Sequence, residues 1–383
     1  MSFEDVPEFL RPKLRLFLSI DLVGSTAFKQ GGVFPIQKPK HDAGIEDVNV
    51  RWLPAVSGFY KDIQEKFATH WDSYCDSLSA GIDWKKGEPP QLWKSNGDEL
   101  VYVKDLVDSI ECFATISCWL KVARDYRNQL REKKQKLDVK LAAWTAGFPI
   151  SNTEVIFQSL EKSDALDGVY SLPEYVHFHL LDTWHNCPEE RVGLVRDFIG
   201  PSMDTGFRIA ARSTSRKFMI SAELALLIAS VNDPLGHDDI DIHFDGSESL
   251  KGVLGGNPYP LFWIDTLKGD SFSRAEDDVK RQVRSEKSSV RNFCNIFIRR
   301  NEDYMLYPFI VTDADPQLRT LPPNYKETIE CLANWWQSVK ENDKARQRSD
   351  SDEPPVEKLG PDTGHVAAVD LSVKIPGIGQ GAA

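Results

Sequence analysis

Two aspartates, Asp21 and Asp98, stand where strands are expected to end. Asp21 follows the apolar run LFLSI (16–20), which predicts a buried strand. Asp98 closes an Asn-Gly-Asp turn between QLWK (91–94) and ELVYV (99–103), the pattern of a hairpin. Each is common alone as a strand end or a turn. Together, two carboxylates at neighbouring strand ends offer the oxygen ligands that Mg²⁺ takes, with phosphates and water completing the shell.

A short run of small residues follows Asp21. It consists of Leu22, Val23, Gly24, Ser25 and Thr26. A turn of this kind brings backbone N–H groups close to phosphate oxygens. The run therefore favours a phosphate-bearing ligand beside the two aspartates, although neither feature is specific by itself.

Composition narrows the function classes. The 383 residues include 46 Lys and Arg against 58 Asp and Glu, a net charge of −12. Binding to a nucleic-acid polymer needs a basic surface, so we expect none. No apolar run approaches about 18 residues and the first residues contain no apolar signal core, so we expect neither a membrane span nor secretion. Six scattered cysteines without a Cys-x-x-Cys pair fit a cytoplasmic protein without a zinc site.

Strand and helix patterns alternate through the first 270 residues. Helical spacing is seen from 56 to 67 and from 106 to 120. Strands are expected at 139–147 and, with a breaker, at 193–200, a helix is expected at 203–216, and Ser221 caps a further helix. The pattern predicts an α/β or α+β domain over 12–270. We expect a mostly helical extension over 271–345 and a disordered tail over 346–383.

Four ordered segments resemble class III nucleotide cyclases. FLSIDLVGSTAF and KSNGDELVYV are similar to the family's paired metal-binding segments, with Lys94 three positions before the glycine. DFIGPSMDTGFR (197–208) keeps the spacing of a third segment, and Leu250-Lys251-Gly252 resembles a late strand. The resemblance covers residues 14–266. It implies an α+β fold with a ferredoxin-like βαββαβ sheet and helices packed on it.

The resemblance also implies roles. Asp21, Leu22 and Asp98 would hold two Mg²⁺ or Mn²⁺ ions per site. The nucleotide would contact residues 22–26, Lys94 and Asp197. The catalytic set would be Arg208, Asp204 and Lys251, although the family has Asn at position 204. In the family each site combines residues of two subunits, so the resemblance implies a homodimer with composite active sites.

The insertion at 29–50, the FIGPSMDTGFR segment and the C-terminal extension look most like the pyrimidine cyclases of bacterial Pycsar anti-phage systems. This implies that UTP is converted into 3′,5′-cyclic UMP and diphosphate, and that a separate effector protein reads the product.

The nucleobase stays open on the residues alone. A Lys donor beside an Asp acceptor suits the edge of adenine or cytosine, whereas the resemblance favours UTP, with CTP second and ATP third. Two further alternatives are an adenylate cyclase and a degenerate, non-enzymatic module that binds nucleotide or dimerises. A dinucleotide synthase of the GGDEF type lacks support, because the turn reads NGDE.

Overall fold

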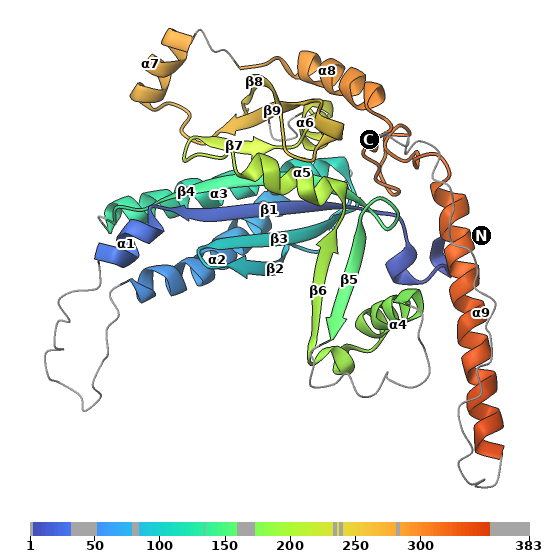
Figure 1. Ribbon diagram of the computed structural model, residues 1–383. Helices are drawn as coiled ribbons and strands as arrows, with labels where there is room; N and C mark the ends of the chain where they lie inside the picture. The colour runs from blue at the N-terminus through green and yellow to red at the C-terminus, as the bar shows by residue number, and fades with distance from the viewer. Residues whose placement is uncertain are drawn as a thin grey trace, which may run out of the picture.

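The computed structural model describes residues 3–31, 52–78, 84–133, 135–158, 173–232, 236, 240–280 and 284–352. Most of the expected insertion at 29–50 and the tail beyond 352 therefore lie outside the described residues. Figure 1 shows one sheet with helices on both sides and a two-stranded ribbon that projects from it.

Seven strands form the main sheet, in the order β2-β3-β1-β4-β7-β9-β8. They are β1 (Lys13–Val23), β2 (Gln91–Asn96), β3 (Glu99–Leu106), β4 (Asp138–Phe148), β7 (Lys217–Ile220), β8 (Ile242–Ser249) and β9 (Pro258–Asp265). β4 and β7 are parallel and the other neighbours are antiparallel. The arrangement β2-β3-β1-β4, all antiparallel, is that of a βαββαβ ferredoxin-like core. The α+β expectation is confirmed.

Nine helices are described. They are α1 (Ser25–Gly31), α2 (Leu53–Leu78), α3 (Ser109–Glu132), α4 (Pro173–Asn186), α5 (Pro201–Ala210), α6 (Ala222–Ser230), α7 (Ser271–Lys280), α8 (Lys287–Arg300) and α9 (Tyr325–Asp352). In Figure 1, α2 and α3 lie behind the sheet and α5 crosses in front of it. No helix among the described residues is long and apolar enough to cross a bilayer.

The central strand β1 is buried on both faces, which explains its near-continuous apolar sequence. Leu18 lies opposite Tyr102 of β3, whose ring meets Trp119 of α3 with centroids 5.4 Å apart. Phe17 points the other way and stacks on Trp144 of β4 at 5.6 Å. Because successive side chains alternate, the odd-numbered residues of β1 share the Phe17 face, called here the α5 face.

The helix expected at 203–216 is shorter than the pattern predicted. α5 ends at Ala210. Beyond it the hydroxyl of Ser213 donates to the Ala210 carbonyl at 2.7 Å, and the Thr214 hydroxyl accepts from the Lys217 amide at 3.0 Å. Side-chain oxygens thus compete with helical hydrogen bonds and form a turn. The predicted cap is confirmed, because Ser221 accepts from the Leu224 amide at 3.2 Å.

Two helices after residue 270, α8 and α9, pack against earlier parts of the chain. Val290, Cys294 and Ile298 of α8 belong to the hydrophobic cluster of the sheet. Trp336 of α9 contacts Phe9 near the N-terminus, with ring centroids 6.5 Å apart. α9 continues to Asp352, seven residues past the boundary at 345 that was expected for the helical extension. KARQR (344–348) consists of good helix formers, and the first proline after it is Pro354.

A second two-stranded sheet, β5 (Thr153–Gln158) with β6 (Leu194–Ile199), forms the ribbon that Figure 1 shows projecting from the main sheet, with α4 near its far end. We call it the β5–β6 arm. Its apolar residues divide between two faces. Ile156 and Phe198 are 3% exposed, whereas Phe157 and Val195, which lie opposite each other, are 51% and 61% exposed.

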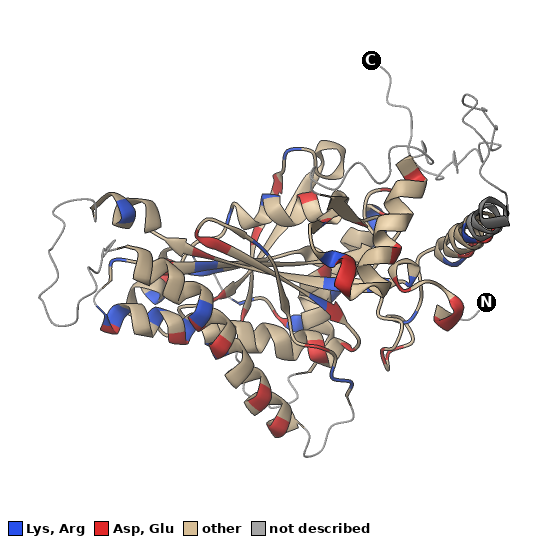
Figure 2. Ribbon diagram, turned by 90° about the horizontal axis from the view of Figure 1, so that it is seen from below, with Lys and Arg blue, Asp and Glu red and all other residues tan. Residues whose placement is uncertain are grey.

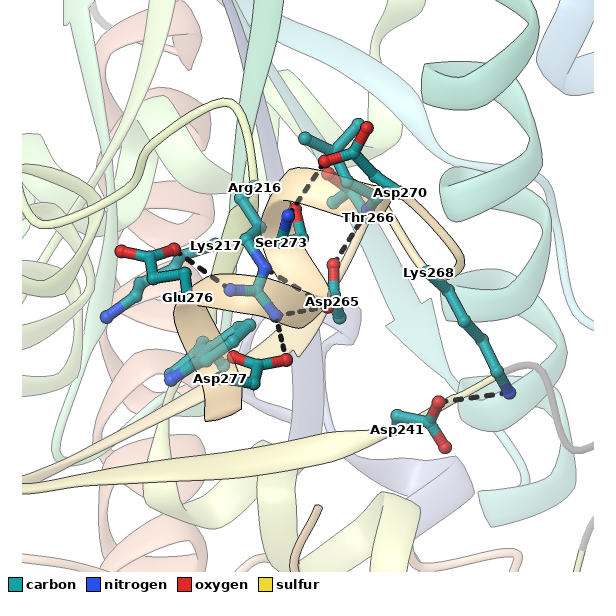
Figure 3. A network of polar contacts seen from close by, with 12 residues as sticks. Arg216, Lys217, Asp241, Asp265, Thr266, Lys268, Asp270, Ser273, Glu276 and Asp277 are labelled. Carbon is teal, nitrogen blue, oxygen red and sulfur yellow. Dashed lines mark hydrogen bonds and ion pairs between the residues drawn. The ribbon is translucent and has the colours of Figure 1, made fainter. Parts of the chain in front are cut away.

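Charge holds α7 to the sheet. Arg216, just before β7, contacts Asp265 of β9 at 2.8 Å and Glu276 and Asp277 of α7 at 3.1 and 2.6 Å (Figure 3). Only Ser273 of α7 is buried. The docking of this helix therefore depends on one arginine that joins three carboxylates. Elsewhere, acidic and basic segments are interspersed along the ribbon (Figure 2).

Candidate active site

Asp21 and Asp98 lie at the same end of two neighbouring strands. Asp21 is opposite Glu99 of β3 on one side and Lys140 of β4 on the other. The Leu22 amide donates to the Asp98 carbonyl at 3.2 Å. The turn before β3 places Gly97 at φ 70°, a conformation that glycine adopts without strain. The sheet register thus brings together two acids that are 77 residues apart in sequence.

Each carboxylate is paired with a lysine that the sequence analysis did not select. Lys140 Nζ lies 2.9 Å from Asp21 Oδ2, and Lys29 Nζ lies 3.3 Å from Asp98 Oδ1. The buried Ser25 hydroxyl donates to the other oxygen of Asp98. Lys29 is one helical turn after Ser25 on α1, and that spacing was the available signal. Lys140 becomes evident only from the strand register.

The Asp98 carboxylate is held in its ionised form. Partial burial alone would raise its pKa, but the hydrogen bonds from Ser25 and Lys29 outweigh burial and lower the pKa below the ordinary value. The carboxylate is therefore charged at neutral pH and able to bind a cation.

The donor set fits a hard divalent cation. Asp21 and Asp98 supply carboxylate oxygens. Each carboxylate already pairs with a cation, the ammonium group of Lys140 or Lys29. No group of three or more His, Cys, Asp or Glu side chains able to hold a metal occurs among the described residues. Two carboxylates completed by water and substrate phosphates are a usual environment for Mg²⁺, while Zn²⁺ would require more protein ligands.

A β-bulge in β2 turns two consecutive side chains toward the α5 face. Leu92 pairs with Tyr102 and Lys94 with Val101, so Trp93 is the extra residue. Val101 lies opposite Ser19, which puts Lys94 on the α5 face. The Trp93 ring also reaches that face, where it meets Phe17 with centroids 5.4 Å apart.

Lys94 and Asp197, predicted from separate motifs, are in contact. Lys94 Nζ lies 3.2 Å from Asp197 Oδ1, and the ammonium lies 3.9 Å from the centre of the Trp93 ring and 5.3 Å from that of Phe207. Asp197 Oδ1 also accepts from the Phe198 amide at 2.9 Å. The two side chains are 39% and 35% exposed, so a ligand can reach both.

α5 presents two predicted residues to solvent. Asp204 and Arg208 are both exposed and lie one helical turn apart. Gly206, between them, faces β4. A Cβ there would come within 2.3 Å of the Trp144 ring, so glycine permits the close approach of helix and sheet. α5 therefore packs against Trp144, on the same sheet face as Asp21.

The third and fourth motif segments meet at Arg208. Its Nε donates to the Lys251 carbonyl at 3.2 Å, in the turn after β8. The Lys251 side chain is exposed. No ion pair between Asp204 and Arg208 is seen among the described residues, so Asp204 does not hold the guanidinium here.

Glu99 is a further acid that sequence reasoning missed. It lies directly opposite Asp21 and accepts from the Ser19 hydroxyl at 2.6 Å. The DE pair at 98–99 was visible in the sequence, but only the register shows that Glu99 and Asp21 lie side by side on one sheet face.

The fold of the chain is weakly similar to those of three solved structures. The adenylyl cyclase CyaB from P. aeruginosa has a TM-score of 0.39 and 13% identity, covering 66% of this chain and 94% of that chain. The guanylyl cyclase Cya2 has 0.37 and 12%, covering 66% and 92%. The guanylate cyclase domain of RhGC from Catenaria anguillulae, in complex with GTP, has 0.36 and 8%, covering 66% and 96%.

No family model and no curated protein matches the chain. Because the three TM-scores are below 0.5, a functional assignment has to be supported by the residues and their contacts.

Proposed function

We propose that this protein is a nucleotide cyclase of the class III type, which converts a nucleoside triphosphate into a 3′,5′-cyclic monophosphate and diphosphate. The main support is the convergence of four distant segments. Asp21, Lys94 and the helix of Arg208 lie on the α5 face of the main sheet, with Asp98 beside Asp21, and Asp197 of the β5–β6 arm contacts Lys94. Two carboxylates, a polar pair able to read a base and an exposed arginine are the parts that such a reaction uses.

In the proposed reaction the ribose 3′ oxygen forms a bond to the α-phosphorus. The bond from that phosphorus to the bridging oxygen breaks, diphosphate leaves, and the hydroxyl proton passes to solvent. Asp21 and Asp98, with the Leu22 carbonyl as a further proposed ligand, would hold Mg²⁺ or Mn²⁺, which lowers the pKa of the hydroxyl and neutralises phosphate charge when bound. Arg208 and Lys251 are the proposed donors to charge on the phosphates, and residues 22–26 the proposed backbone contact.

The proposed substrate is a pyrimidine nucleotide, UTP first and CTP second. Lys94 can donate to a base carbonyl while Asp197 accepts from a ring N–H, which is the edge of uracil. The aromatic rings of Trp93 and Phe207 flank the Lys94 ammonium and offer faces for a flat base. ATP is retained as the third candidate. The cyclic product is proposed to act as a second messenger in anti-phage defence, read by a separate effector.

The active form is proposed to be a homodimer with composite sites, each of which combines Asp21 and Asp98 of one protomer with the Lys94–Asp197 pair and Arg208 of its partner. The exposed face of the β5–β6 arm carries Phe157, Val195 and Ile199, exposed by 51%, 61% and 50%. An apolar strip of this kind indicates a protein contact. Asp197 has the same strand parity as Val195 and Ile199, so the contact would lie beside the proposed base-reading residue.

The test is incubation of the purified protein with each of the four nucleoside triphosphates and Mg²⁺ or Mn²⁺, followed by chromatography of the products. A cyclic pyrimidine monophosphate supports the proposal, and a cyclic purine product corrects the base. Coexpression of Asp21→Ala with Arg208→Ala, each inactive alone, is expected to restore partial activity through mixed dimers. Absence of recovery contradicts shared sites.

One observation favours the non-enzymatic alternative. Lysines already neutralise both candidate metal ligands. If a folded dimer binds nucleotide but yields no cyclic product with any of the four triphosphates, the proposal of a non-enzymatic nucleotide-binding module replaces that of a cyclase.

A further inference from the structure

Asp197 belongs to the β5–β6 arm, which projects from the main sheet (Figure 1). The position of Asp197 therefore depends on the contacts that hold the arm. Its inner face is therefore the place to look for what fixes its position. Glu154 of β5 and Phe198 of β6 are opposite each other and point to that inner face, where they are 4% and 3% exposed. Asp197, the residue before Phe198 in β6, points to the opposite face.

Glu154 is a buried carboxylate shared by three cationic or titratable groups. Arg15 Nη2 of β1 lies 2.9 Å from its Oε2. His185 Nε2 of α4 and Arg196 Nη1 of β6 lie 3.2 and 3.7 Å from its Oε1. The side chains of Arg15 and Glu154 are each 5% exposed. One carboxylate thus joins the main sheet, both strands of the arm and α4.

Arg15, the partner of Glu154 on β1, is itself held by further contacts. Its Nε lies 2.8 Å from Asp105 of β3, and its guanidinium lies 4.6 Å from the ring centre of Phe148 and 4.9 Å from that of Phe198. A planar guanidinium held between two rings and two carboxylates has little freedom to move. The base of the arm is therefore held in a fixed position relative to the main sheet.

Contacts continue from this anchor to the base-reading pair. Phe198 meets Trp93 with ring centroids 5.0 Å apart, and Trp93 Nε1 donates to the Arg196 carbonyl at 3.3 Å. Trp93 is the bulge residue beside Lys94, and Arg196 precedes Asp197 in β6. The backbone on both sides of the Lys94–Asp197 contact is thus connected to the Arg15–Glu154 pair.

We infer that Arg15 and Glu154 are positioning residues for nucleobase selection, which hold the arm so that Asp197 faces Lys94 at hydrogen-bonding distance. This inference rests on the proposed function. Neither residue contacts the base-reading side chains. Loss of the Glu154 charge leaves Arg15 and Arg196 close together without their shared anion, and the arm relaxes away from the sheet. A displacement of about 1 Å is enough to weaken a recognition contact.

The test compares Glu154→Gln with a matched control, Glu111→Gln. Glu111 of α3 is fully buried and pairs with Lys104 at 2.7 Å. Lys104 lies opposite Leu16, on the other face of the sheet from Glu154's partner Arg15. Both variants remove one buried charge, but only the first is connected to the arm. Arg15→Lys, which keeps the charge and loses the planar fork, is a second variant in case Glu154→Gln does not fold.

The readout is the ratio of kcat/KM between the preferred triphosphate and the second best. Glu154→Gln and Arg15→Lys are expected to lower this ratio about tenfold, mainly through KM, as expected when a charge-assisted hydrogen bond is misplaced. Glu111→Gln is expected to lower Tm while it keeps the ratio. An unchanged ratio in folded Glu154→Gln or Arg15→Lys overturns the inference while the cyclase assignment stands.

If the wild type yields no cyclic product, the proposed function fails, and the same variants are compared by calorimetric binding of the four triphosphates. A binding preference that is lost in Glu154→Gln and kept in Glu111→Gln still supports the positioning role. A preference that both variants keep, or the absence of any nucleotide binding, overturns it.

Discussion

At the scale of single residues, the candidate site depends on how the Asp98 carboxylate is kept ionised. Ser25 and Lys29 hydrogen-bond to Asp98 and hold its pKa below the ordinary value against the effect of burial. Because the folded-state pKa is depressed, the stabilisation is present above the unfolded pKa of about 4 and is lost as pH falls through the folded value.

Ser25→Ala is therefore expected to raise the pKa of Asp98. The hydroxyl is buried, and its removal leaves one carboxylate oxygen without that donor. Carbon-detected NMR titration of the side-chain carboxyl measures the shift. Thr26→Ala on the exposed side of α1 is the control, because that residue is exposed and expected to leave the Asp98 titration as in the wild type. An unchanged titration in Ser25→Ala contradicts the role given to Ser25.

The residues that the sequence could predict are those whose type and motif spacing suffice. Asp21 and Asp98 were selected in this way, whereas Lys94, Asp197 and Arg208 were selected from the resemblance to cyclase motifs, and the structure brings Lys94 to Asp197. Lys140 and Glu99 were missed because their place beside Asp21 depends on the register of three strands. The sequence alone does not specify that register.

At the scale of elements, α7 provides a direct test of docking by charge. Arg216 joins three carboxylates, and although burial alone would lower its pKa, Asp277 and Asp265 raise it above the ordinary value. Arg216→Met leaves Asp265, which is 7% exposed, without its cation. Breaking such a buried pair costs about 3 kcal/mol.

Hydrogen exchange is the appropriate measurement for Arg216→Met. Amides of α7 are expected to exchange much faster than in the wild type, while those of β1 change little. Lys280→Met, which removes only an exposed pair with Glu276 at 2.7 Å, should leave exchange in α7 nearly unchanged. Equal protection of α7 in Arg216→Met and wild type would show that other contacts hold the helix.

Elements were predictable where one period dominates the sequence. The apolar run of β1, the Asn-Gly hairpin and the Ser221 cap are local signals, and the structure has all three. The β5–β6 arm was only partly predicted, since β6 was expected as a strand and β5 was not. Its strands carry apolar residues on both faces, and the charged Glu154 is buried beside Ile156 and Phe198, so β5 lacks the usual alternation of apolar inside and polar outside. The bulge at Trp93 likewise follows from tertiary packing.

At the scale of the whole molecule, Glu154 links acid stability to the position of the arm. Burial alone would raise its pKa, but the hydrogen bond to His185 and the charges of Arg15 and Arg196 lower it to about 2. The stabilisation is therefore complete above the unfolded pKa of about 4.3 and is lost as pH falls toward 2.

Urea unfolding at a series of pH values tests this sign. Between pH 5 and pH 3 the wild type is expected to lose more free energy of unfolding than Glu154→Gln, because the variant has no carboxylate to protonate at this position. The variant is the less stable of the two at pH 7. Parallel curves for the two proteins would show that Glu154 has no depressed pKa in the folded state.

The whole account depends on Asp21 and Asp98 acting together on a nucleoside triphosphate. The most direct measurement is metal-dependent turnover of the preferred triphosphate by Asp21→Asn and Asp98→Asn, with Asp125→Asn on the exposed side of α3 as the control. We expect each of the first two to lose at least about a hundredfold in kcat while remaining folded, and the control to match the wild type. Turnover by folded Asp21→Asn or Asp98→Asn at the wild-type rate would contradict the account.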